Sequence, residues 1–169
     1  MTDSGPLRVS VRPYEPADAG VTLTIFTDAI TQTAAAHYRP EQIEAWARPG
    51  RRALADWDRE RGERATVVAV LETEVVGFSD VDRDGWIDML FVAPRYHRRG
   101  VARTLLGSIE RGARAAGAAQ LSADVSLPAR PCFERIGFAV VREQRARAEG
   151  IALTNYRMVK ELTASPSGR

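Results

Sequence analysis

The sequence predicts a single α+β domain, built on a mixed and mostly antiparallel sheet of six to seven strands flanked by helices. Three observations support this prediction: a length of 169 residues, three β-rich runs in succession between 66 and 92, and a strand, a long amphipathic helix and a second strand within 86–125. The last arrangement is a crossover connection, which makes its two strands parallel neighbours. We expect the domain to span 1–162 and the polar segment 163–169 to be a disordered tail.

The N-terminal third is expected to hold one edge strand and three helices. Apolar and polar residues alternate over 7–14, which predicts the strand. Asp18 can cap the helix that follows, and Pro40 interrupts its pattern. Two shorter helices are then expected at 41–47 and 51–60.

The rest of the chain is expected to alternate between strands and helices. Runs at 66–71, 75–81 and 86–92 are separated by tight polar turns, so they predict an antiparallel meander. From Val101 to about Ala116, apolar residues recur at every fourth position, which is typical of an amphipathic helix. The remaining elements are, in order, a strand at 119–125, a short helix at 128–136 and an antiparallel pair of strands at 138–142 and 151–159.

Composition and charge argue against several classes of protein. The formal net charge is only +2, and no stripe of basic residues interleaved with aromatic residues occurs, which argues against nucleic-acid binding. We interpret the basic segment 142–147 as a solvated strand edge or loop. No stretch approaches the roughly 20 apolar residues of a membrane span. No cluster of histidine, cysteine and carboxylate residues has metal-ligand spacing, so we expect no metal.

Cysteine usage and the N-terminus predict the compartment. Cys132 is the only cysteine, so an internal disulfide is impossible and a reducing compartment is favoured. The first seven residues are short of apolar side chains and contain no signal-peptide core. We therefore expect a cytoplasmic protein with neither a membrane nor a nucleic-acid partner.

An anion site is predicted at the start of the long helix, where the chain reads Arg98, Arg99, Gly100, Val101, Ala102 and Arg103. A helix N-terminus carries unpaired N–H groups and a partial positive charge, both of which favour an anion. Gly100 lets a phosphate approach the backbone closely, and the arginines add donors. Neither the nucleoside-triphosphate loop nor the dinucleotide-binding motif is present. Taken alone, the same segment would also serve as a solvated helix cap.

Two blocks of the sequence resemble the GCN5-related N-acetyltransferase (GNAT) superfamily. The segment 90–106 is similar to the family signature Gln/Arg-x-x-Gly-x-Gly/Ala, with His97 at its first position. The segment 129–138 is similar to a second block, Ala-x-x-apolar-Tyr-x-x-x-Gly-Phe, with Phe133 in place of the tyrosine. The segment 33–47 also resembles a bacterial subgroup, and the whole resemblance covers about 7–162.

The resemblance implies the acyl-CoA N-acyltransferase fold and direct transfer of an acetyl group from acetyl-CoA to a primary amine in a ternary complex. The amine is a small molecule or a peptide, and a homodimer is possible. The coenzyme pyrophosphate is expected at 98–103 and its pantetheine arm in a gap between two strands. Further coenzyme contacts are expected from Leu90, Phe91, Val92, Ser126 and Phe133, with a backbone N–H of Leu90 or Phe91 meeting the oxyanion. His37, Tyr38 and Trp46 are expected to contact the acceptor.

The catalytic groups are less clear from the sequence. Asp88 is the first candidate for the general base, because a carboxylate in an otherwise apolar strand is costly unless it is paired or used. The alternatives are a salt bridge to an arginine or a position at a sheet edge. Phe133 cannot donate a proton, so Tyr156 and Cys132 compete for the role of general acid. The missing tyrosine also keeps a second function open, an acyl-CoA-binding sensor without transfer activity.

Overall fold

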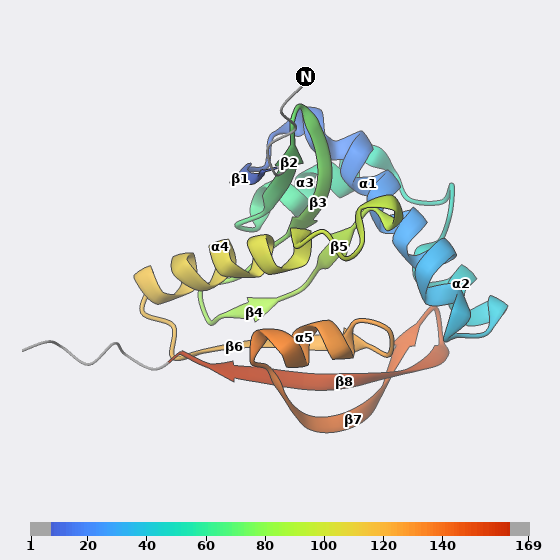
Figure 1. Cartoon of the computed structure of the whole chain (residues 1–169). Helices are drawn as coiled ribbons and strands as arrows, with labels where there is room; N and C mark the ends of the chain where they lie inside the picture. Colours follow the sequence, from blue (N-terminus) through green and yellow to red (C-terminus); the bar gives the residue numbers. More distant parts are fainter. Residues whose placement is uncertain (1–7, 163–169) are drawn as a thin grey trace, which may run out of the picture.

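Two four-stranded sheets organise the chain, and the computed structural model describes residues 8–162 of it (Figure 1). The first sheet has the order β1 (Val9–Pro13), β2 (Val67–Leu71), β3 (Glu74–Ser79) and β5 (Leu90–Val92). The second has the order β4 (Trp86–Ile87), β6 (Gln120–Ser126), β8 (Ile151–Glu161) and β7 (Ala139–Ala148). The α+β class is confirmed, but the six or seven strands expected in one sheet are eight strands in two.

The division between the sheets comes from a break in the strand expected at 86–92. β4 pairs with β6 in parallel, which confirms the crossover, whereas β5 pairs with β3 in the antiparallel sense. Asp88 and Met89 lie between the two short strands and belong to neither. The buried carboxylate of Asp80 holds this break, because its Oδ1 accepts a hydrogen bond of 2.9 Å from the backbone N–H of Asp88. A gap therefore opens between β5 and β6.

The long helix α4 (Val101–Ala115) lies across the first sheet, and its buried face is apolar. The helix packs closely against Gly77 of β3. A Cβ atom at this position would lie 3.0 Å from the carbonyl oxygen of Phe91 and 3.1 Å from the Val101 side chain. Contacts below about 3.4 Å force a neighbour to move, so glycine allows this spacing. The packing places the N-terminus of α4 beside the end of β5.

The N-terminal helices cover the other face of the first sheet. They are α1 (Ala19–Asp28), which continues through short turns at Ala29–Thr33 and Ala34–Ala36, then α2 (Pro40–Ala47) and α3 (Leu54–Glu63). Val68 packs with α1 and α3, while its neighbour Ala69 packs with α4, so the two sets of helices lie on opposite faces. The three predicted helices are confirmed, although the third starts later than expected and continues through Gly62.

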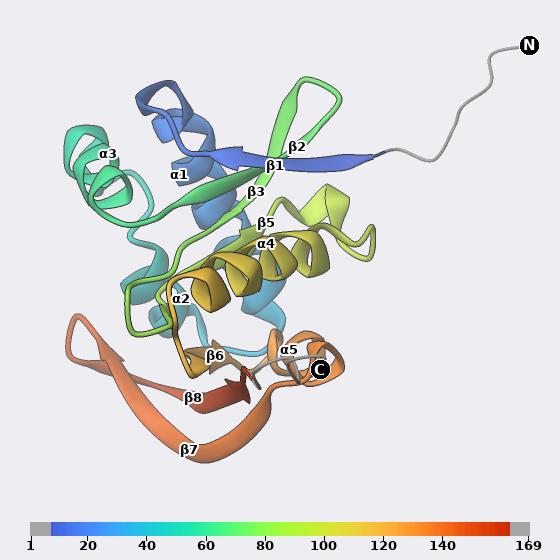
Figure 2. The ribbon, with the colours of Figure 1, turned by 90° about the vertical axis from the view of Figure 1, so that its left-hand side faces the viewer.

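The second sheet carries the short helix α5 (Arg130–Ile136) and ends in the long β7–β8 hairpin, which is paired along its length (Figure 2). The hairpin reaches α2, where the Nε2 of Gln42 donates to the carbonyl oxygen of Ala152 at 2.9 Å. The basic segment 142–147 lies in β7, at the edge of the sheet. The expected tail at 163–169 lies outside the described residues. Across residues 8–162, no helix is long and apolar enough to cross a membrane.

Candidate active site

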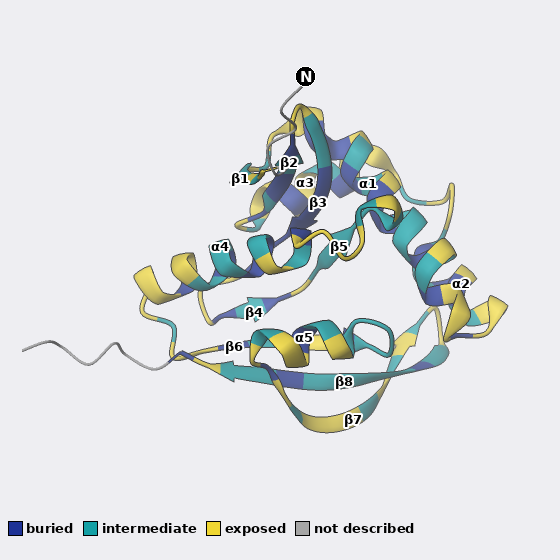
Figure 3. Ribbon diagram, viewed as in Figure 1, coloured by how far each residue is buried: buried dark blue, intermediate teal, exposed yellow. Residues whose placement is uncertain are grey.

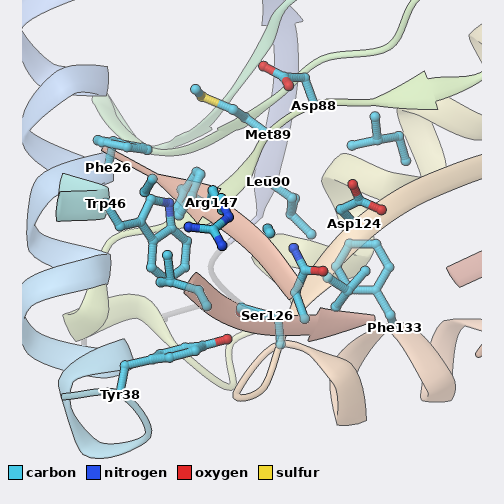
Figure 4. A pocket seen from close by; sticks show the side chains of 18 of the residues that line it. Phe26, Tyr38, Trp46, Asp88, Met89, Leu90, Asp124, Ser126, Phe133 and Arg147 are labelled. Carbon is cyan, nitrogen blue, oxygen red and sulfur yellow. The ribbon is translucent and has the colours of Figure 1, made fainter. Parts of the chain in front are cut away.

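A cavity of about 310 Å³ lies where β5 and β6 separate (Figure 4). Its walls come from both sheets, from α1 and α2, and from the β7–β8 hairpin. The lining residues include apolar, acidic and basic side chains. Among the lining residues are Phe26, Tyr38, Trp46, Arg52, Asp88, Met89, Leu90, Asp124, Ser126, Phe133, Arg147 and Asn155.

The loop between β5 and α4 has the backbone expected of an anion site. Gly100 is the N-cap of α4 with φ of 77°, and Arg98 has φ of 60°, so two residues near the helix start adopt the left-handed conformation. No side chain of the described residues caps this end, and its N–H groups are left for another acceptor. The space next to Gly100 is open, and the loop is exposed (Figure 3).

The arginines of this loop are not neutralised by the protein. Within residues 8–162, none of Arg98, Arg99 and Arg103 lies within 4.0 Å of a carboxylate, although Arg99 lies 5.6 Å from the centre of the Tyr96 ring. Val101 is 1% exposed and points into the core, so only its backbone can contact a ligand. Ala102 follows it in the first turn of α4, where we likewise expect a backbone contact. The site therefore combines a helix start with uncompensated positive charge.

β5 presents part of its backbone to the gap. The carbonyl of Met89 and the N–H of Ala93 are bonded to β3, so the intervening groups of Leu90 and Val92 face the other way, because neighbouring residues of a strand alternate. The Val92 carbonyl accepts a bond of 3.2 Å from Nε2 of His97. Of the two N–H groups expected to meet an oxyanion, Leu90 faces the gap and Phe91 faces β3.

Asp88 lies at the rim of the cavity rather than inside an apolar strand. Its side chain is 43% exposed, because the strand breaks there, and its carboxylate points away from the centre of the cavity (Figure 4). The nearest cation is Nη2 of Arg61 at 3.7 Å. Arg61 is itself bonded at 2.8 Å to Asp80, whose pKa is raised because burial disfavours its charged form. Asp88 therefore has access to the cavity, which a general base needs, and it also has an arginine neighbour, as the salt-bridge alternative requires.

Neither expected general acid lines the cavity. Tyr156 projects toward α5, where the guanidinium carbon of Arg130 lies 4.5 Å from the centre of its ring. Cys132 is half-buried on α5, and burial raises the pKa of its thiol. Phe133, at the position of the family's tyrosine, does line the cavity and is 4% exposed. Tyr156 and Cys132 thus lie outside this cavity, whereas Phe133 forms part of its wall.

The residues expected to contact the acceptor divide in the same way. Tyr38 and Trp46 line the cavity, with their rings in edge contact 5.8 Å apart. The Tyr38 hydroxyl donates to the carbonyl of Thr154 at 2.7 Å and accepts from the N–H of Leu127 at 3.0 Å. Burial raises the pKa of Tyr38. His37 is exposed and does not line the cavity.

Several lining residues were missed from the sequence. Asp124 lies between buried Ala123 and Val125 on β6, and this alternation of polar and apolar residues is a signal for a face directed away from the core. Ser126, which the resemblance implies as a coenzyme contact, follows on the same face and also lines the cavity. Arg147 lies in the segment interpreted as a solvated edge. Phe26, Arg52, Met89 and Asn155 reach the cavity through tertiary packing. Oδ1 of Asn155 is buried without a hydrogen-bond partner among the described residues.

Comparison with known proteins gives consistent matches over this chain. The family model described as an acetyltransferase (GNAT) domain matches residues 34–160. The uncharacterized N-acetyltransferase YafP of Escherichia coli is 38% identical over 151 residues, which cover 89% of this chain and 94% of that protein. A GCN5-related N-acetyltransferase structure from Rhodopseudomonas palustris, also named a class-II aminotransferase, is 36% identical with a TM-score of 0.86, over 96% of this chain and 99% of that one. PaiA N-acetyltransferase of Thermoplasma acidophilum, solved in complex with coenzyme A, shares the fold at 17% identity, with a TM-score of 0.71 over 92% and 100% of the two chains.

Proposed function

The chain belongs to the GNAT acetyltransferase family, and we propose that it transfers the acetyl group of acetyl-CoA directly to a primary amine held in the cavity. One observation carries the proposal most strongly: the uncapped N-terminus of α4 lies beside the gap where β5 and β6 separate. An anion bound at the helix start and an extended arm in the gap would together reach the lining residues. Two structures of the same fold, PaiA and YncA of Salmonella typhimurium, are described with coenzyme A and with acetyl-CoA.

The residues present suit this acyl donor. The backbone N–H groups of 100–103 would hold the pyrophosphate, supported by Arg98, Arg99 and Arg103. The gap edge of β5 offers hydrogen-bonding groups of Leu90 to the pantetheine amides. Ser126 and Phe133 line the cavity from the opposite side. The thioester supplies an activated acyl group, and the chain orients it.

The acceptor amine must lose a proton before it can attack, since an alkyl amine has a pKa of about 10.4. Asp88 is the proposed base, and its exposure at the rim lets it take the proton through solvent rather than by direct contact. The Leu90 N–H stabilises the oxyanion that forms when the amine attacks. Asp124 is a second carboxylate at the cavity, but Nε of Arg157 holds it at 2.6 Å.

The leaving thiolate needs no acid from this chain. Phe133 has no proton to give, and Tyr156 and Cys132 lie away from the cavity. A thiol with a pKa near 8.5 is a tolerable leaving group as its thiolate, and solvent can protonate it afterwards. We therefore propose that transfer depends on positioning and on the base, and that solvent, rather than Tyr156 or Cys132, protonates the thiolate.

A turnover assay tests the proposal. Purified protein, acetyl-CoA and a panel of primary amines should release free coenzyme thiol and yield acetylated amines detectable by mass spectrometry. Tight binding of acetyl-CoA with no turnover on any amine, including peptides, would instead support the acyl-CoA sensor and overturn the proposed transfer.

A further inference from the structure

We propose that the acceptor is an amine that also carries a carboxylate, which Arg52 and Arg147 recognise. This inference rests on the proposed function, because it names the substrate class of the same cavity. Both arginines line the cavity, and the guanidinium of Arg147 lies in its middle, beside Trp46 (Figure 4). The balance of charge around the cavity favours an acceptor with a carboxylate.

The two carboxylates of the cavity already have cationic neighbours. Asp124 is paired with Arg157 at 2.6 Å, and Asp88 lies 3.7 Å from Arg61. Neither Arg157 nor Arg61 lines the cavity. The negative charge of the lining is therefore offset from outside, and it is not available to neutralise the arginines within.

In the described part of the chain, the two arginines of the cavity donate hydrogen bonds only to backbone carbonyls. Arg52 donates to the carbonyls of Trp46 at 3.0 Å and Ala47 at 3.2 Å, at the C-terminal end of α2. Arg147 donates one bond of 2.8 Å to the carbonyl of Gly150. No carboxylate among residues 8–162 lies within 4.0 Å of either side chain. Each guanidinium thus has donors left for an anion.

Arg52 is also partly removed from water. Its guanidinium carbon lies 4.7 Å from the centre of the Phe26 ring, and burial lowers its pKa. A carboxylate bound here would restore a favourable environment for the charge, and a planar guanidinium offers the paired donors that a carboxylate accepts. The rings of Phe26, Trp46 and Tyr38 would hold an apolar segment between the carboxylate and the amine. The amine would then lie at the end of the cavity formed by Asp88 and Leu90.

The experiment compares 4-(aminomethyl)benzoate with 4-(aminomethyl)benzamide as acceptors for the whole protein. The two amines have nearly the same shape and differ in charge at one end. We expect kcat/KM to be at least about tenfold higher for the acid, since charge-assisted hydrogen bonds are lost with the amide. Phenylalanine and phenylalaninamide repeat the comparison with a shorter distance between amine and carboxylate.

Two variants assign the effect to the proposed residues. Arg147→Met should raise KM for the acid about tenfold and change KM for the amide by less, so the preference for the acid should be lost. Arg52→Gln should act in the same direction. Arg145→Met is the matched control, because Arg145 lies on the same strand but outside the cavity. Binding of acetyl-CoA and thermal unfolding show whether each variant remains folded.

The outcomes separate this inference from the proposed function. Equal kcat/KM for acid and amide in both pairs would overturn the carboxylate proposal while leaving amine acetylation intact. A preference for the acid that survives both Arg147→Met and Arg52→Gln would overturn it as well. Failure of every amine to be acetylated would instead contradict the proposed function.

Discussion

The proposed donor site and the proposed acceptor end of the cavity are built in different ways. The donor end is one continuous segment, 90–103, and it offers mainly backbone groups: the gap edge of β5 and the start of α4. The acceptor end gathers side chains from α1, α2, β6 and the β7–β8 hairpin, together with Arg52. Because one end depends on backbone conformation and the other on side chains, substitutions should affect them differently.

With the proposed sites, this difference would allow one fold to keep its acyl donor while its acceptor changes. A backbone site tolerates most side-chain changes as long as the left-handed residues and the helix start are preserved. The acceptor end has no such protection, since each lining residue contributes its own chemistry. Substitutions at the two sites test this contrast, and the largest effect is expected at Gly100.

Gly100→Glu should remove acetyl-CoA binding. The change adds bulk at a left-handed position and a negative charge where phosphate must lie. Two like charges 4 Å apart repel by about 4 kcal/mol at an effective dielectric constant of about 20, which corresponds to roughly a thousandfold in affinity. Isothermal titration calorimetry measures this directly.

The control for this variant is Gly112→Glu, which adds the same charge to the exposed side of the same helix. Its acetyl-CoA affinity should stay close to that of the natural protein. Retained binding in folded Gly100→Glu protein would break the comparison, because the donor end would then not depend on the backbone at the start of α4.

Asp88→Asn should lower kcat by about a hundredfold, at the lower end of the range for loss of a general base, since Asp88 is exposed and acts through solvent. Acetyl-CoA affinity should remain unchanged. Steady-state kinetics on one amine give both values. Asp84→Asn, in the exposed turn before β4, is the control for a lost surface carboxylate.

Asp124→Asn decides which carboxylate is the base. If Asp124→Asn lowers kcat more than Asp88→Asn does, then the assignment of Asp88 is wrong and the base lies on β6. If Asp124→Asn lowers kcat less than Asp88→Asn does, the result supports Asp88, at the rim of the cavity, as the general base.

The helix start that forms the proposed donor end could be predicted from the sequence, and most of the proposed acceptor end could not. Gly100 and the apolar residues that follow it determine the helix start locally, so their pattern was sufficient. The break at Asp88 was not visible, because residues 86–92 form a continuous apolar run apart from one carboxylate, and the break depends on a hydrogen bond from buried Asp80. The prediction of a single sheet is wrong for the same reason, because the break at Asp88 divides the strands between two sheets.

The acceptor residues are separated in the chain and meet only through tertiary packing. Arg52 precedes a helix by two residues, and Arg147 sits in an edge strand, positions where arginine is ordinarily solvated. The sequence does not determine which face of the last strand carries Tyr156, and Cys132 is a candidate because it is next to Phe133. Neither side chain lines the cavity. Alternation along β6 could have identified Asp124, whereas nothing in the local pattern identifies Arg52.

Tyr38→Phe should disturb the acceptor end without affecting the donor end. It removes the hydroxyl that joins Thr154 to Leu127 and leaves two backbone groups without this partner. We expect a loss of about 1–3 kcal/mol in the free energy of unfolding and a higher KM for the amine, because the wall beside Trp46 loosens. Urea denaturation and kinetics measure the two effects.

Tyr14→Phe is the matched control, since its hydroxyl donates to Asp58 at 2.8 Å, away from the cavity. It should leave the KM of the amine unchanged. An equal rise in KM for Tyr14→Phe would mean that lost stability, rather than the local wall, controls acceptor binding.

His97→Gln should have the smallest effect, although it changes the first position of the donor signature. The His97 ring is exposed, and its contact is one bond of 3.2 Å to the Val92 carbonyl. Such a bond contributes about 0.5–1.5 kcal/mol, so we expect acetyl-CoA affinity to change by less than about tenfold. Calorimetry beside Gly100→Glu places both changes on one scale. If His97→Gln weakens binding as much as Gly100→Glu does, then the donor end also depends on a particular side chain, and the contrast between the two ends fails. A small effect means that the backbone conformation of the loop, set by its left-handed residues and the start of α4, is what holds the acyl donor.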